Sequence, residues 1–291
     1  PTAALKFARY MAARDQGLPI FRHHGLRPVE GDVWVERPEL TFFCGAVNRR
    51  AMEQILEDFE KREGVVINTV YDGCGILTSR MQTFEGQKPD NGFPDVYMAC
   101  DVYYLENVKD WFQEAANVSD TEIVIAVPKG STKVQSLADL VKPGVRVAIG
   151  EPDQCTIGAL TRRLLAKEGL YEPLKEKQEQ ADEVVVEKSS SALLVPDVVT
   201  GSVDATVAYI TDVLANEDQI DVIHVESSLN KAIQPISIAK TSDHKDLVRR
   251  LLRRVAASPQ AFENVGFHFR MTEESAAEEP ADSPEAAGDS E

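Results

Sequence analysis

The chain of 291 residues carries a formal net charge of −17, and 43% of its residues are hydrophobic. Its length suits one two-lobed domain or two small ones, and its charge argues against nucleic acid or an anionic membrane as the main partner. No apolar run approaches the roughly 18 residues of a membrane-spanning helix. No signal peptide is visible, so the sequence alone does not state a localisation.

A repeat appears at the two ends of the chain. Residues 5–28 and 246–269 share one pattern at a constant offset, which aligns Phe21 with Phe262 and Gly25 with Gly266. Each segment reads as an amphipathic helix, a break and a second helix that ends in Phe-x-x-x-Gly. We interpret residues 1–38 as the closing helices of a preceding similar domain plus a linker, and expect them to be dispensable for the domain that follows. Chance similarity between two helix pairs is the alternative.

Strands and helices alternate between residues 40 and 270. The apolar runs predict strands at 40–44, 65–71, 94–100, 121–130, 145–150, 183–188 and 204–210, with helices at 48–64, 75–84, 156–170 and 191–201. Such alternation predicts parallel sheets covered by helices. Ligands of such sheets bind outside the carboxyl ends of the strands.

The end of the chain, residues 271–291, is an acidic tail. From Thr272 onward it holds eight acidic residues, no basic residue and no aromatic residue. This composition predicts disorder, and we assign the tail no role in binding.

One predicted turn draws attention, because Cys74 lies between Gly73 and Gly75 where a strand gives way to a helix. Glycine-flanked turns into helices bring backbone N–H groups close to a ligand. The positive end of the helix dipole favours an anion there. The thiol in this position is a ligand, a disulfide partner or a small apolar filler.

The order of motifs resembles the periplasmic molybdate-binding protein family, which are type II solute-binding proteins of ABC transporters. The resemblance covers residues 40–270 and rests on LTFFCGAVNRRAMEQILEDFEKREG, YDGCGILTSRM, FPDVYMACD, TEIVIAVPKG, VAIGEPDQCTIGALTRRLL and GSVDATVAYITDV. It implies an α/β fold with two lobes joined by crossing strands and a ligand cleft between them. One lobe would comprise about 40–120 and 235–270, and the other about 128–225.

The resemblance also implies a set of ligand-binding residues. The family holds a tetrahedral oxyanion with hydroxyl and backbone N–H groups at loop-to-helix junctions. The matching positions are Gly45, Ala46, Val47, Gly73, Cys74, Gly75, Cys155, Thr156, Ser189, Ser190, Ser191 and Tyr209. Serine is expected where this chain has Val47 and Cys74. A hydrogen bond to a charged group contributes about 1.5–3 kcal/mol, so these replacements put tight molybdate binding in doubt.

The four cysteines, Cys44, Cys74, Cys100 and Cys155, all fall at predicted strand ends or helix starts that border this cleft. Four converging thiolates would hold a soft metal such as Cu(I) or zinc, or an iron–sulfur cluster. Disulfides are the second possibility, with Cys44 and Cys74 as the expected pair because the first two loops are neighbours in such sheets. Buried fillers are the third. Helix N-termini at Cys74 and Cys155 would lower the pKa of both thiols.

The sequence therefore predicts a solute-binding protein that captures a small, molybdate-like oxyanion for a membrane permease. The resemblance implies a periplasmic or other extracytoplasmic location. The alternative is a metal- or redox-cofactor-binding protein with a cysteine-lined cleft on the same fold. We find no nucleophile–base pair, Walker loop or dinucleotide motif, and so expect no enzyme.

Overall fold

The computed structural model describes residues 3–27, 29–84 and 92–272. Its strands are β1 (Glu39–Gly45), β2 (Val66–Asp72), β3 (Val96–Met98), β4 (Phe112–Pro128), β5 (Val147–Gly150), β6 (Val185–Lys188), β7 (Ala205–Tyr209), β8 (Ile220–His224), β9 (Lys231–Ala239) and β10 (His268–Phe269). The acidic tail from residue 273 lies outside the described residues.

The α-helices are α1 (Ala3–Ala12), α2 (Gly17–His23), α3 (Arg49–Glu63), α4 (Cys74–Gln82), α5 (Val102–Glu106), α6 (Thr156–Lys167), α7 (Tyr171–Gln178), α8 (Leu194–Val199), α9 (Ile210–Val213), α10 (Lys245–Ala256) and α11 (Pro259–Glu263). Short 3₁₀ turns include η1 (Ala46–Asn48) and η5 (Ser191–Leu193). Among the described residues, no helix is both long and apolar enough to cross a membrane.

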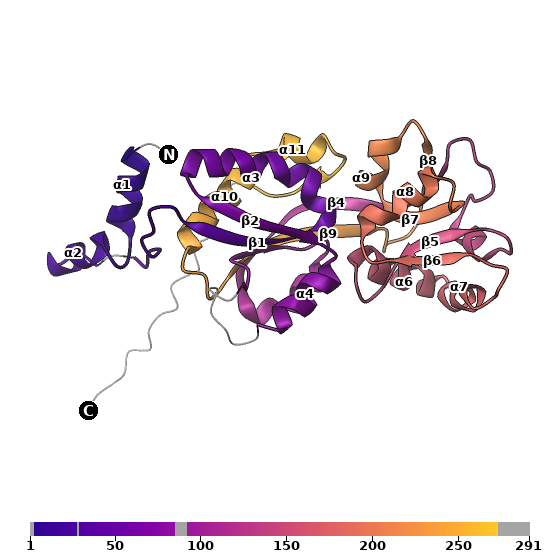
Figure 1. The fold of residues 1–291 in the computed structure, drawn as a ribbon, viewed down its shortest axis with the longest axis horizontal. Helices are drawn as coiled ribbons and strands as arrows, with labels where there is room; N and C mark the ends of the chain where they lie inside the picture. Colours follow the sequence, from indigo (N-terminus) through magenta and orange to yellow (C-terminus); the bar gives the residue numbers. More distant parts are fainter. Residues whose placement is uncertain (1–2, 28, 85–91, 273–291) are drawn as a thin grey trace, which may run out of the picture.

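The strands follow the order β2-β1-β3-β9-β4-β7-β5-β6. β1, β2 and β3 pair in parallel, and so do β5, β6 and β7. β4 joins the two groups, because its first part pairs with β9 and its later part with β7, both antiparallel. Figure 1 shows the result as two α/β halves. We call the half with β1–β3 and β9 the first half, and the half with β5–β8 the second half.

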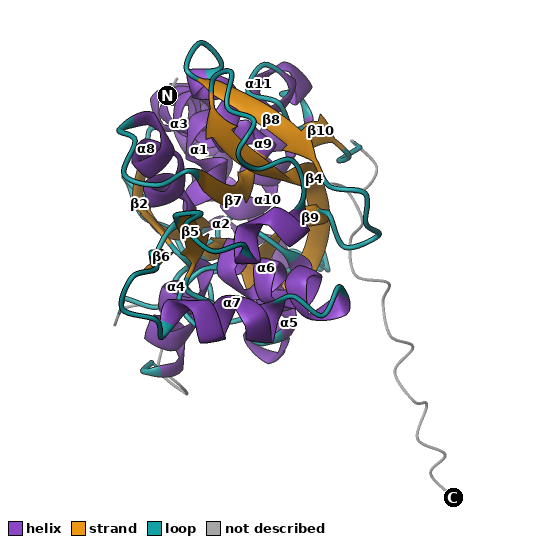
Figure 2. Ribbon diagram, turned by 90° about the vertical axis from the view of Figure 1, so that its right-hand side faces the viewer, coloured by secondary structure: helices purple, strands orange, loops and turns teal. Residues whose placement is uncertain are grey.

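Helices cover both faces of each group of strands. In the first half α3, α10 and α11 lie on one side and α4 on the other (Figure 1). In the second half α6 and α7 lie on one side of the sheet and α8 and α9 on the opposite side (Figure 2). Because both faces are covered, a strand inside the sheet such as β1 is apolar on both of its faces. Phe42 and Phe43, which point to opposite faces of β1, are both buried.

The local sequence explains the boundaries of α3. Met52, Ile55 and Phe59 are spaced three and four residues apart and are buried as one stripe. Gly64 then adopts the left-handed conformation, with φ of 66°, and donates its N–H to the carbonyl of Glu60 at 2.8 Å. A glycine takes this conformation without steric cost, so the helix ends there.

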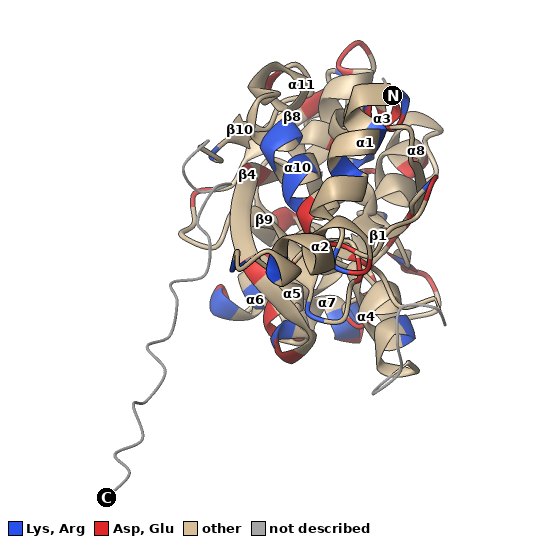
Figure 3. Ribbon diagram, turned by 90° about the vertical axis from the view of Figure 1, so that its left-hand side faces the viewer, with Lys and Arg blue, Asp and Glu red and all other residues tan. Residues whose placement is uncertain are grey.

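The N-terminal segment forms the helix, break and helix that the repeat predicted, as α1 and α2. In the described part of residues 3–38 no strand pairs with the sheet. The segment nevertheless contacts the first half: Arg9 donates to the carbonyl of Glu63 at 2.8 Å, and Arg14 pairs with Asp243. Figure 3 shows that α1 lies next to the basic residues of α10.

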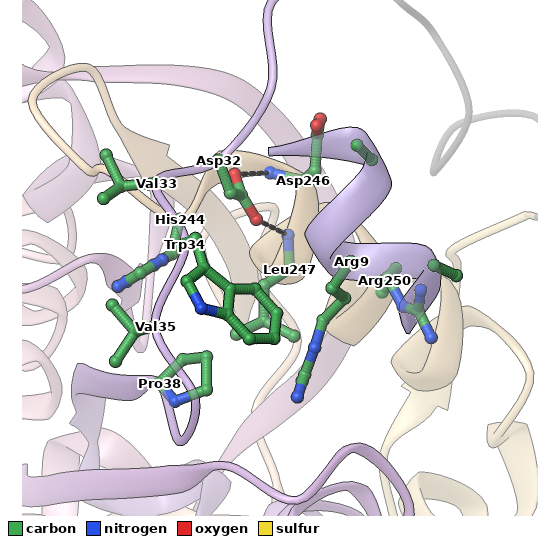
Figure 4. Close-up of a pocket in the computed structure, with 12 residues that line it drawn as sticks. Arg9, Asp32, Val33, Trp34, Val35, Pro38, His244, Asp246, Leu247 and Arg250 are labelled. Atoms are coloured by element: carbon green, nitrogen blue, oxygen red, sulfur yellow. Dashed lines mark hydrogen bonds between the residues drawn. The ribbon is translucent and has the colours of Figure 1, made fainter. Parts of the chain in front are cut away.

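Asp32 also links this segment to the domain, through the backbone of α10. Its carboxylate accepts hydrogen bonds from the N–H groups of Asp246 at 2.8 Å and Leu247 at 2.9 Å, in the first turn of α10 (Figure 4). His244, which precedes the helix, makes no capping hydrogen bond with its side chain. Asp32 therefore caps α10 from a position more than 200 residues away in the sequence.

Replacing Asp32 with alanine should lower the free energy of unfolding by about 0.5–2 kcal/mol, because two N–H groups of α10 lose their acceptor. Urea unfolding followed by circular dichroism measures this. Glu36→Ala is the control, since Glu36 is exposed and makes only a surface ion pair with Lys6. Equal stability of Asp32→Ala and the wild type would show that the cap contributes nothing.

Deletion of residues 1–38 should lower the free energy of unfolding at least as much as Asp32→Ala does, yet leave a domain that still unfolds cooperatively.

Candidate functional site

A small cavity lies where the two halves meet. It is lined by Ala46, Asp72, Gly73, Cys100, Cys155, Thr156, Ile157, Ser190, Ser191 and Tyr209. Each lining residue ends one of the six parallel strands or lies within a few residues of that end. The cavity therefore occupies the place where α/β sheets bind ligands, outside the carboxyl ends of the strands.

Direct contacts hold the two halves together around this cavity. The N–H of Ile76 in α4 donates to the carbonyl of Gln154 at 3.3 Å, and Arg50 donates to the carbonyl of Thr211 at 3.2 Å. A Cβ atom added to Gly75 would lie only 2.2 Å from the carbonyl oxygen of Asp153. The structure is thus a closed form, and glycine at position 75 permits the closure.

Two helices begin at the cavity and direct their N-termini toward it. α4 begins at Cys74 in the first half, and α6 begins at Thr156 in the second half. The first N–H groups of a helix have no acceptor within the helix, and the helix dipole adds partial positive charge. This arrangement suits an anionic or strongly polar guest.

Two buried hydroxyl groups at the cavity lack a normal hydrogen-bond partner among the described residues. The hydroxyl of Tyr209, at the end of β7, is fully buried and has no hydrogen-bond partner among the described residues. The hydroxyl of Thr156 likewise makes no hydrogen bond of normal geometry within the described part of the chain, although it helps to lower the pKa of the Cys74 thiol. Buried polar groups are rarely left unpaired, so these two groups indicate a polar guest.

An acidic group also belongs to the site. Asp72 lines the cavity and accepts a hydrogen bond from the N–H of Gly73 at 2.8 Å. Asp212 lies next to Ser191, and burial raises the pKa of Asp212 to about 6. Of the described residues that line the cavity, none is a lysine, arginine or histidine. Hydroxyl and N–H groups, and no cationic side chain, would bind the guest.

The structure brings together many of the residues that the sequence singled out. Those that line the cavity are Ala46, Gly73, Cys155, Thr156, Ser190, Ser191 and Tyr209. Others lie beside it without lining it, namely Gly45, Val47, Cys74, Gly75 and Ser189. Sequence reasoning missed Asp72 and Ile157. Asp72 directly precedes the glycine turn, but a carboxylate is not a residue type that an expected anion site suggests.

The four cysteines are all buried and all free. Cys74 lies against Cys100, with the two Sγ atoms 3.1 Å apart, and the expected disulfide between Cys44 and Cys74 is not present. Cys44 donates instead to the carbonyl of Gly45. Within the described ranges, no group of three or more Cys, His, Asp or Glu side chains is arranged to hold a metal ion. The structure thus gives no support to a shared metal or iron–sulfur cluster.

The thiol pKa is lowered at Cys74, as expected, but not at Cys155. Burial by itself would raise the pKa of Cys74, but hydrogen bonds from the thiol and the N–H of Cys100, with the nearby Thr156 hydroxyl, lower it overall. At Cys155 burial outweighs the helix N-terminus and raises the thiol pKa to about 12. The predicted lowering at Cys155 is therefore wrong, because the protein interior penalises the thiolate more than one helix end stabilises it.

A larger cavity, of about 220 Å³, lies away from this site, between the N-terminal segment and α10 (Figure 4). Trp34 and Val35 line it together with Leu247 of α10. Its acidic residue, Asp32, already accepts two hydrogen bonds from the α10 backbone. The carboxyl ends of the parallel strands, and not this cavity, therefore carry the candidate site.

Comparison with known proteins identifies the family and the fold. Residues 40–267 match the family described as bacterial extracellular solute-binding protein. The putative ABC transporter substrate-binding lipoprotein YvgL of Bacillus subtilis is 27% identical over 236 residues, which are 78% of this chain and 85% of the relative. The molybdate-binding protein ModA of Mycobacterium bovis is 23% identical over 75% of this chain and 79% of its own.

Solved structures show the same fold. The periplasmic molybdate-binding protein of Azotobacter vinelandii superposes with a TM-score of 0.63 at 14% identity, over 80% of this chain and all of the other. The sulfate-binding protein SubI of Mycobacterium tuberculosis gives 0.63 at 16% identity, over 79% and 86% of the two chains. The fold is that of the two-lobed periplasmic binding proteins, as the sequence predicted. This chain belongs to the bacterial extracellular solute-binding protein family, which comprises solute-binding proteins of ABC transporters and not enzymes.

Proposed function

We propose that this protein captures a small inorganic oxyanion outside the cytoplasmic membrane and delivers it to the permease of an ABC transporter. The observation that carries the proposal is the cavity at the ends of the six parallel strands, with two unpaired buried hydroxyl groups. Relatives named for molybdate and sulfate binding support the class of ligand.

The donors that surround the cavity define how the guest would be held. Hydroxyl groups of Tyr209 and Thr156 would each donate one hydrogen bond to an oxygen of the guest. The N-termini of α4 and α6 would add backbone N–H groups and the positive ends of two helix dipoles. Donors from both halves meet at one place, so ligand binding and closure are linked.

The closed cavity is small. Its volume of about 10 Å³ is close to the room that one water needs, roughly 10–15 Å³. A tetrahedral oxyanion therefore requires the two halves to part slightly around it. Val47 and Cys74 provide no hydroxyl donor where the family has serine, and Asp72 adds a carboxylate to the cavity wall. Both differences should make the binding of a divalent anion weaker than it would be with serine at both positions.

Isothermal titration of the purified protein with molybdate, tungstate and sulfate tests the proposal. We expect one site per chain and a dissociation constant in the micromolar range or weaker, equivalent to roughly 8 kcal/mol or less. Binding should also raise the temperature of thermal unfolding as the ligand concentration rises, because only the folded state binds. The proposal would fail if none of these anions, and no other inorganic oxyanion such as arsenite, gave a heat of binding or a shift in unfolding temperature.

A further inference from the structure

Two sulfur atoms lie in contact at the wall of the cavity. Cys74 is the first residue of α4, and Cys100 follows β3. Their Sγ atoms are 3.1 Å apart, and the backbone N–H of Cys100 donates to the Sγ of Cys74 at 3.1 Å. Cys100 lines the cavity, whereas Cys74 does not line it but contacts Cys100 through its sulfur. The pair therefore forms a dithiol with one sulfur-bearing residue at the cavity wall.

Gly45 leaves the space that this pair occupies. A Cβ atom at position 45 would lie 2.2 Å from the Sγ of Cys100 and 2.8 Å from the Sγ of Cys74. Both distances are far below ordinary contact, so any side chain at this position would push the sulfurs apart. The loop after β1, the loop after β2 and the end of β3 thus fit together only with glycine at position 45.

The contact between the two thiols shifts their pKa values in opposite directions. The hydrogen bond to Cys74, followed by burial, raises the pKa of Cys100 well above its usual value. The same hydrogen bond, the N–H of Cys100 and the nearby Thr156 hydroxyl oppose burial and lower the pKa of Cys74. Of the two, Cys74 is therefore the one that ionises more readily, and a thiolate is the form of cysteine that attacks electrophiles.

The other groups that line the cavity indicate which kind of thiol-binding solute would fit. Asp72 places a carboxylate on the wall, which repels a divalent anion but accepts a hydrogen bond from a neutral acid. Tyr209 and Thr156 offer hydroxyl groups that pair with oxygen atoms. A neutral oxyacid with a soft central atom matches all three kinds of group: the dithiol, the carboxylate and the hydroxyls.

We propose that the solute is a trivalent, thiol-binding oxyacid of the arsenite class, whose central atom is bound by Cys74 and Cys100. This inference rests on the proposed function, because it names the substrate class of the same site. Each As–S bond forms as one As–OH bond breaks, and each departing hydroxyl leaves as water. Each thiol supplies the proton for one of the two departing hydroxyls, so two waters are released. Arsenic remains trivalent and keeps one hydroxyl, which lies next to Asp72.

The geometry disfavours other guests of a dithiol. Zinc in a closed protein site takes four ligands, and the described residues offer no group of three that could hold a metal ion. A linear two-coordinate Cu(I) ion would hold the two sulfurs on opposite sides, whereas these sulfurs are already in contact. A pyramidal trivalent centre binds two neighbouring sulfurs on one side of itself.

The test uses anaerobically purified protein reduced with a phosphine, which is then removed. Titration with sodium arsenite, followed by native mass spectrometry, should show one adduct per chain whose mass corresponds to AsOH gained and two hydrogens lost. Cys74→Ser and Cys100→Ser should each weaken arsenite binding by about 100-fold or more, because the second sulfur binds intramolecularly. Cys44→Ser is the matched control, since Cys44 is equally buried but directs its thiol to the carbonyl of Gly45 and not to the Cys74–Cys100 pair.

A second measurement keeps the test independent of how the variants fold. Arsenite should protect Cys74 and Cys100 of the wild-type protein from alkylation by iodoacetamide, with peptide mass spectrometry as the readout. The inference would be overturned if arsenite left Cys74 and Cys100 open to alkylation. It would also be overturned if Cys44→Ser weakened arsenite binding as much as Cys74→Ser does.

Titrations with molybdate, tungstate and sulfate separate this inference from the proposed function. If tetrahedral oxyanions bind and arsenite does not, the dithiol inference fails while oxyanion capture stands. If arsenite binds to the cysteines but Tyr209→Phe and Thr156→Val leave the affinity unchanged, the cavity is not the solute site and the proposed function fails. If no oxyanion binds at all, both fail.

Discussion

Replacing Gly75 with alanine should abolish solute binding while leaving the domain folded. In the closed form the added Cβ would lie 2.2 Å from the carbonyl oxygen of Asp153 and 2.7 Å from that of Gln154. Both atoms belong to the backbone of the opposite half, so only separation of the halves relieves the overlap. Because apparent affinity falls with the fraction of closed molecules, we expect a loss of about 100-fold or more.

The same substitution should not harm the folding of the first half. Gly75 is the second residue of α4, and alanine favours a helix over glycine by about 1 kcal/mol in helix interiors. Small-angle X-ray scattering with ligand present should therefore show a larger radius of gyration for Gly75→Ala than for the wild type, with an unchanged unfolding temperature or a higher one. Ser79→Ala, at an exposed position of the same helix, is the control. Wild-type affinity in Gly75→Ala would mean that closure is not required.

Removing the two unpaired hydroxyl groups should give the second largest effect. A hydrogen bond to a charged group contributes about 1.5–3 kcal/mol, which is about tenfold to a hundredfold in affinity. Tyr209→Phe and Thr156→Val should each weaken oxyanion binding by this amount. Neither should lower stability much, because each hydroxyl is already buried without a normal partner in the described part of the protein.

Thr161→Val provides a matched control for this experiment. Thr161 lies on the same helix as Thr156, is fully buried and also lacks a partner for its hydroxyl among the described residues, but it does not line the cavity. Titration calorimetry and thermal unfolding should therefore show a change in affinity at Thr156 and none at Thr161. Equal losses at both positions would indicate a packing effect on α6 and not a contact with the solute.

The alternation of strands and helices could be predicted from the sequence, and so could the end of the sheets at which the site lies. Parallel strands covered on both faces are apolar throughout, and they gather the loops after their carboxyl ends at one place. Thr156 and Tyr209 follow from this rule and from the family resemblance. Such patterns depend on neighbouring residues, which a sequence displays directly.

Features that depend on distant residues could not be predicted in this way. The contact between Cys74 and Cys100 depends on the space that Gly45 leaves, and the cap of α10 depends on Asp32. β4 has a register shift after Gln113, where Glu114 adopts a φ of 54° and pairs with Arg249. At Cys155 the sequence shows a helix start but not the degree of burial, and burial decides the pKa.

The most direct test of a solute site between the two halves is anomalous X-ray scattering from crystals grown with tungstate or arsenite, whichever binds more tightly in titration. The heavy atom should give one strong peak in the cavity, with an oxygen of the solute within about 2.5–3.2 Å of the Tyr209 and Thr156 hydroxyl groups. For arsenite, the peak should also lie at bonding distance from the sulfurs of Cys74 and Cys100. A peak only on the surface, or only in the larger cavity beside Trp34, would contradict the account.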